Sequence, residues 1–99
     1  MSSENTPGFP GGVRAAIAAN IRAERARARL SQQAVADGMR DYGYISWYPQ
    51  TAGQVERGSR PVHADELIAL AGVLGTAPDT LWRVTPSNHM RKIGADLVK

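Results

Sequence analysis

Apolar stripes at helical spacing follow one another along this chain, and residues that end a helix come after each stripe. In the clearest stripe, Leu67, Leu70, Ala71 and Leu74 recur at intervals of three and four residues, so they share one helix face. Gly75 follows, where glycine commonly ends a helix. Aromatic residues are few and β-branched residues are scattered, which disfavours strands. We therefore expect an all-α protein.

Residues that begin or end helices divide the chain into segments. Ser31 is a good N-cap, Pro49 is tolerated only in a first turn, and Thr76 is expected to cap a short helix. We expect helices over residues 13–29, 32–40, 47–56 and 63–74, a fifth that contains Leu81 and Trp82, and an extra helix over 88–98. These form one domain, 13–83, between a flexible tail at 1–12 and a C-terminal extension at 84–99. Trp47 and Trp82 are expected in the core.

Several classes of function are disfavoured by composition. Cysteine is absent, which excludes disulfides and thiolate metal sites and favours the cytoplasm. No apolar run reaches the roughly 18 residues of a membrane span, and there is no signal-peptide pattern. His63 and His89 stand alone, at a helix start or on the surface, without the spacing of metal ligands. No catalytic motif is present, so we expect no enzyme, no cofactor and no metal.

Positive charge is concentrated in the first half of the domain. Residues 13–60 hold eight arginines and four acids, whereas residues 61–99 hold four basic and four acidic groups. Such an excess suits a polyanion such as a nucleic acid. A solvated helix face would explain it equally well.

The short helix expected at 47–56 carries unusual outward residues. Gln50, Thr51 and Gln54 are neither core residues nor the Lys/Glu pairs of a solubilising face. Gln50 and Gln54 are four residues apart and point the same way. An amide can read adenine in the major groove, and a threonine can offer a hydroxyl or a methyl group to a base. An ordinary polar helix face is the alternative.

Two motifs in this region resemble a known family. The run LSQQAVA at residues 30–36, followed by VERG at residues 55–58, is similar to the Cro/C1-type (XRE) helix-turn-helix domain of phage repressors and bacterial regulators, actinobacterial members included. The resemblance covers roughly residues 13–83. It implies a five-helix, lambda repressor-like fold that binds double-stranded DNA.

The resemblance also implies roles for particular residues. Base reading falls to Gln50, Thr51 and Gln54, and contact with the DNA backbone to Gln32, Gln33, Arg57, Ser59 and Arg60. Arg25 and Glu56 match a buried ion pair that ties the first helix to the third. The residues themselves support this pair, because Glu56 adjoins the apolar Val55 and an unpaired buried carboxylate is costly.

The chain departs from the family between its second and third helices. The stretch from Met39 to Trp47 is about five residues longer than the usual tight turn. Within it, DYGYIS at residues 41–46 has turn chemistry and two tyrosines. Tyr42 and Tyr44 either cover the edge of the core or meet the DNA backbone.

The sequence thus predicts a sequence-specific DNA-binding transcriptional regulator, a repressor by its resemblance, that acts as a homodimer. The dimer surface is expected in the C-terminal segment, with Trp82, Met90, Ile93 and Leu97. The alternative is an antitoxin or adaptor that binds a protein partner, such as a toxin, through residues 84–99 and regulates its own promoter.

Overall fold

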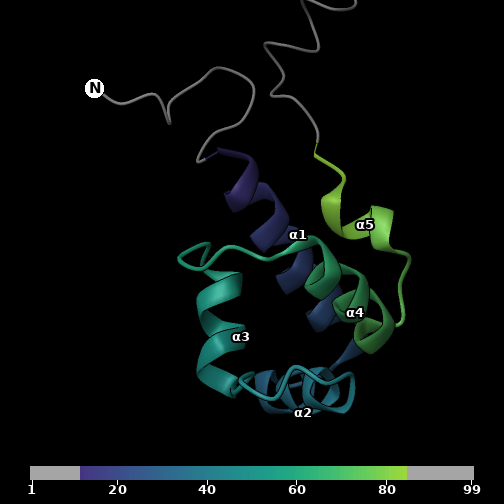
Figure 1. The fold of residues 1–99 in the computed structure, drawn as a ribbon. Coiled ribbons are helices and arrows are strands. Elements are labelled where there is room, and N and C mark those ends of the chain that lie inside the picture. Colours follow the sequence, from purple (N-terminus) through teal and green to yellow (C-terminus); the bar gives the residue numbers. More distant parts are fainter. Residues whose placement is uncertain (1–11, 85–99) are drawn as a thin grey trace, which may run out of the picture.

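Five helices and no strand make up residues 12–84, the part of the chain that the computed structural model describes. They are α1 (Gly12–Ala28), α2 (Gln32–Asp41), α3 (Pro49–Glu56), α4 (Ala64–Leu74) and α5 (Pro78–Trp82), shown in Figure 1. The expected all-α, five-helix fold is confirmed. None of the five described helices combines the length and the hydropathy that a membrane-spanning helix needs. The expected tail, apart from Gly12, and the expected helix over 88–98 lie outside the described residues.

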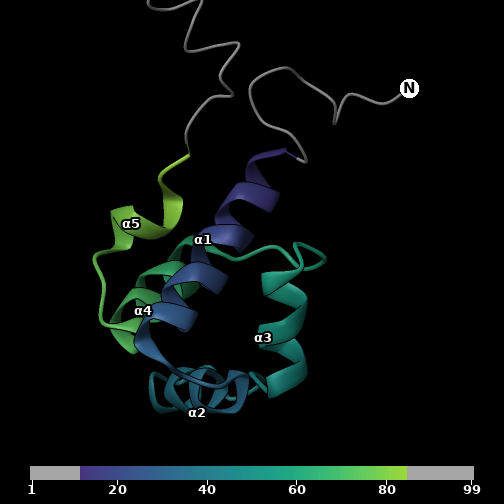
Figure 2. The same cartoon turned by 180° about the vertical axis from the view of Figure 1, so that it is seen from behind.

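The helices pack so that α3 stands to one side of the molecule. Both Figure 1 and the reverse view in Figure 2 show α2 crossing below α3, with α4 beside α1 and α5 at the opposite side from α3. The contacts agree, because α2 packs on α3 and α4, while α5 packs on α1 and α4. This arrangement leaves one long face of α3 without a neighbouring helix.

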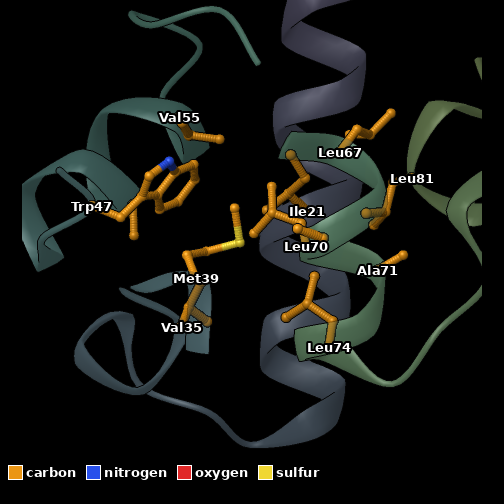
Figure 3. Close-up of a cluster of buried hydrophobic side chains, with 12 residues drawn as sticks. Ile21, Val35, Met39, Trp47, Val55, Leu67, Leu70, Ala71, Leu74 and Leu81 are labelled. Atoms are coloured by element: carbon orange, nitrogen blue, oxygen red, sulfur yellow. The ribbon is translucent and has the colours of Figure 1, made fainter. Parts of the chain in front are cut away.

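The core collects the predicted apolar stripes from all five helices and the α2–α3 turn (Figure 3). Leu70 and Leu81 are fully buried, and Trp47 is 1% exposed. Trp82, however, is 48% exposed, so its expected place in the core was wrong. Successive residues on a helix point about 100° apart. Because Leu81 takes the core position on the short α5, the next residue is turned toward solvent.

Helix boundaries follow the capping chemistry with two corrections. Ser31 caps α2, since its hydroxyl accepts a hydrogen bond from the Ala34 N–H at 3.0 Å. α3 begins at Pro49 rather than at Trp47, because the proline occupies the first turn and Trp47 belongs to the preceding turn. The residue that caps α5 is Ala77 rather than Thr76, and Pro78 is its first helical residue.

Gly38 sits inside α2, where glycine normally weakens a helix. A Cβ atom at this position would lie 2.8 Å from a methyl carbon of Val73 on α4, closer than two carbons can approach. The missing side chain therefore lets α2 and α4 pack closely. This contact helps to fix α2, the helix that supports α3.

Candidate nucleic-acid interface

The uncovered face of α3 carries two of the three predicted base-reading residues. Gln50 and Gln54 are both exposed and lie one helical turn apart. On the opposite face, Ala52 and Val55 are 2% and 1% exposed and hold the helix to the core. The two amides therefore project together from a helix whose other side is buried.

Thr51 is placed differently from the two glutamines. Its hydroxyl accepts a hydrogen bond from the Tyr48 N–H at 3.1 Å and donates to the carbonyl of Ser46 at 3.4 Å. The side chain thus satisfies backbone groups at the start of α3. Its hydroxyl is occupied within the protein, which leaves the methyl group as the part that could contact a base.

The C-terminal end of α3 is held by a buried ion pair. Arg25 donates from Nε and Nη2 to the two carboxylate oxygens of Glu56, at 2.5 and 2.9 Å. Glu56 is only 4% exposed, so the bidentate geometry compensates the cost of burying its charge. The hydrogen bond to Glu56 raises the pKa of Arg25 further above its ordinary value. The pair joins α1 to α3 in the way that the family resemblance implies.

Two more side chains converge on Glu56. Gln32 at the start of α2 donates to its carboxylate at 3.3 Å. Arg22 donates from Nη1 to its backbone carbonyl at 2.7 Å, where a cation also interacts favourably with the negative end of the helix dipole. Sequence reasoning missed this role of Arg22, because nothing in the local sequence marks a partner 34 residues away. Glu56 is thus fixed from both α1 and α2.

The opposite end of α3 is fixed through Glu66 on α4. This carboxylate accepts hydrogen bonds from the Trp47 indole N–H at 3.0 Å and from the His63 backbone N–H at 3.0 Å. Arg60 adds two more, at 2.9 and 3.2 Å. Burial alone would raise the pKa of Glu66, but the hydrogen bonds from Arg60, His63 and Trp47 outweigh it and lower the pKa to about 2.

Sequence reasoning did not find this network. The available signal was the position of Glu66 three residues after the N-cap His63, which is the spacing of a capping box. The partnership with Trp47 could not be read from the sequence, because the two residues meet only in the folded protein.

Arg60 was expected to contact the DNA backbone, but its guanidinium binds groups within the protein. Besides its pair with Glu66, it donates to the carbonyl of Pro61 and its guanidinium lies 5.3 Å from the centre of the Trp47 ring. Its side chain is 27% exposed. The observed contacts therefore give Arg60 a role in holding the loop after α3.

The other predicted backbone contacts lie around the same face. A Cβ atom on Gly53 would be 3.1 Å from a guanidinium nitrogen of Arg57 and 3.5 Å from the amide oxygen of Gln32, so these two side chains flank the glycine. Gln33 is exposed and donates to Asp37 at 2.9 Å. The exposed Ser59 donates its hydroxyl to the backbone carbonyl of Gln54 at 3.1 Å, which closes the end of α3.

The long turn between α2 and α3 is anchored on the protein. The Tyr44 hydroxyl donates to Asp65 at 2.9 Å, and this hydrogen bond raises the pKa of Tyr44. The Tyr42 hydroxyl lies against Gly72, where a Cβ atom would come within 2.2 Å of it. Tyr44 packs against the core, which is one of the two roles considered for it. Tyr42 is 58% exposed and contacts the outer side of α4 instead.

Comparison with known proteins places the chain in a family. A family model described as a helix-turn-helix domain matches residues 16–83. A comparison with curated proteins found no significant match.

Solved structures give the same fold. The clp gene regulator ClgR from C. glutamicum has a TM-score of 0.62 at 20% identity, over 85% of this chain and 92% of that one. A hypothetical transcription factor, NHTF, from Neisseria has a TM-score of 0.61 at 23% identity, over 83% and 85% of the two chains.

The matched residues 16–83 include Glu56 and Glu66, which fix the two ends of α3, and the exposed Gln50 and Gln54. Membership also agrees with the expectation of a non-enzymatic protein, since helix-turn-helix domains are DNA-binding modules. The chain belongs to the helix-turn-helix family of DNA-binding domains.

Proposed function

We propose that this protein is a sequence-specific transcriptional regulator that reads the major groove of double-stranded DNA with α3. The observation that carries the proposal is the exposed pair Gln50 and Gln54 on a helix fixed at both ends. Each amide can donate and accept at once and so match the N6 and N7 atoms of adenine. The methyl group of Thr51 is suited to contact with thymine.

Contacts with the DNA backbone would come from the residues that flank these amides. Arg57 is exposed and has no ion-pair partner among residues 12–84, so its charge is available to a phosphate. Gln32 and Gln33 stand at the start of α2, where backbone N–H groups favour an anion. Arg60 and Ser59 would act mainly by shaping the loop between α3 and α4.

Binding to sequences selected from a random DNA library tests the proposal. Gln54→Ala is expected to relax the preference at one base position by about 1–3 kcal/mol. Gln33→Ala, which removes the same amide from α2, should weaken binding equally on all sequences. If Gln54→Ala leaves the preference at every position intact, α3 does not read bases through this residue.

The salt dependence of binding tests the phosphate contact separately. Arg57→Ala should reduce the slope of log affinity against log salt by about one. Arg83→Ala is the matched control, because Arg83 is an exposed arginine on the far side of the domain and pairs with Asp79. Equal slopes for the two variants would contradict a phosphate contact at Arg57.

The finer features of this function are also proposals. We infer a repressor that acts in the cytoplasm as a homodimer, on half-sites about 34 Å apart. The expected dimer segment and the alternative partner-binding segment at 84–99 lie almost entirely outside the described residues. Sedimentation of the protein with and without operator DNA tests the dimer directly, since a 1:1 complex would contradict it.

A further inference from the structure

The long turn between α2 and α3 and the outer side of α4 together form an exposed apolar surface. Tyr42, Ile45 and Ile68 are 58%, 76% and 57% exposed. On α4, Ile68 follows Asp65 by three residues and Gly72 follows it by seven, so the three share one helix face. The turn touches that face at both ends, through Tyr44 on Asp65 and Tyr42 on Gly72. We name this surface the turn–α4 face.

Backbone hydrogen bonds fix the turn between α2 and α3, and the side chains of Tyr42 and Ile45 are exposed to solvent. The Tyr44 N–H donates to the Met39 carbonyl at 3.1 Å, and the Trp47 N–H donates to the Tyr44 carbonyl at 3.1 Å. The buried Trp47 side chain then ties the end of the turn to the core. Ile45 lies between these two constraints, and its side chain points into solvent. Clustered apolar side chains that stay exposed mark an interaction surface.

The charges at the edge of this face decide what can bind there. Asp41 and Asp65 are exposed carboxylates, and no cation of residues 12–84 lies within ion-pair distance of either. The nearby Arg40 is already paired with Asp37. An acidic edge repels DNA phosphates and would repel the same face of a second copy. A segment with apolar and basic side chains is complementary to it.

The chain itself carries such a segment. Residues 85–99 contain Arg91, Lys92 and Lys99 against one acid, Asp96, and their apolar side chains include Met90, Ile93 and Leu97. Chain beyond Val84 is long enough for contact, because 15 residues can span up to roughly 50 Å. We propose that residues 85–99 bind the turn–α4 face of the same chain through apolar contact and charge. This proposal does not depend on DNA binding.

Paramagnetic labelling of the full-length protein tests the proposal. Because the chain has no cysteine, Ala95→Cys gives a single attachment site for a nitroxide. We expect the amide signals of Ile45, Ile68 and Gly72 to lose most of their intensity. A mixture of ¹⁵N protein without the nitroxide and ¹⁴N protein with it tests whether the contact lies within one chain, because only a contact between two molecules can then weaken the ¹⁵N signals. We expect full signals in the mixture, and a loss that persists there overturns the proposal because a second copy would then supply the segment.

Charge reversal provides the control. Asp41→Lys with Asp65→Lys should restore these signals, whereas Asp79→Lys on α5, also an exposed aspartate, should leave the loss unchanged. Dispersed amide spectra of each variant verify that it is folded. The proposal is overturned if the three amides keep their intensity, if the loss is spread evenly over the domain, or if it centres on the Gln50 and Gln54 face.

Discussion

Glu66→Gln is the substitution whose effect on stability can be worked out most fully. Glutamine keeps the shape of the side chain and can still accept from the Trp47 indole, but it loses the charge that Arg60 faces. The folded protein holds the pKa of this carboxyl at about 2, compared with an ordinary value of 4.5. Folding is therefore coupled to its ionisation.

The size of this coupling follows from the two pKa values. Each unit of pKa corresponds to about 1.4 kcal/mol, so the ionised Glu66 contributes about 3 kcal/mol at neutral pH. Because its pKa is lowered on folding, this contribution is complete above the ordinary value and is lost as the pH falls from about 5 to about 2. For a domain of this size, about 3 kcal/mol is a large part of the total stability.

The assay is urea unfolding followed by far-UV circular dichroism at pH 7, 5 and 3, for the parent and the variant. We expect Glu66→Gln to lower the free energy of unfolding by about 3 kcal/mol at pH 7, and the difference to shrink markedly at pH 3. Asp79→Asn removes an exposed ion pair and should change stability by less than about 1 kcal/mol. A deficit that is independent of pH, or no larger than that of Asp79→Asn, would refute the reasoning.

Three further substitutions test the packing around α3. Arg25→Met should lower the free energy of unfolding by about 3–5 kcal/mol, because it leaves a buried carboxylate unpaired; a loss below about 1 kcal/mol in urea unfolding would contradict this. Gly38→Ala should cost about 1–3 kcal/mol despite its better helix propensity, since the methyl group meets the stiff Val73 side chain. Gly72→Ala should be neutral or gain up to about 1 kcal/mol, because the exposed Tyr42 can swing aside. Equal melting temperatures for the two alanine variants would show that these contacts do not limit packing.

Most of the fold was accessible from the sequence because helices are encoded locally. The stripe that contains Leu67 and Leu74, the cap at Ser31 and the proline at Pro49 each depend on residues within a few positions of one another. The same is true of the exposed glutamines, whose spacing alone puts them on one face. Trp82 was misplaced because burial on a one-turn helix depends on which neighbour reaches the core first, and Leu81 does.

Local sequence patterns were enough to predict the five helices and to place Gln50 and Gln54 on one exposed face of α3. Which arginines around α3 are paired within the protein became evident only from the packing of the helices. Arg57 is exposed, whereas Arg22, Arg25 and Arg60 bind carbonyl or carboxylate groups 6 to 34 residues away. An arginine side chain carries the same charge whether it is exposed or paired, so the sequence does not distinguish the two cases. Its partner is set by which helices pack together, and that is a property of the whole fold.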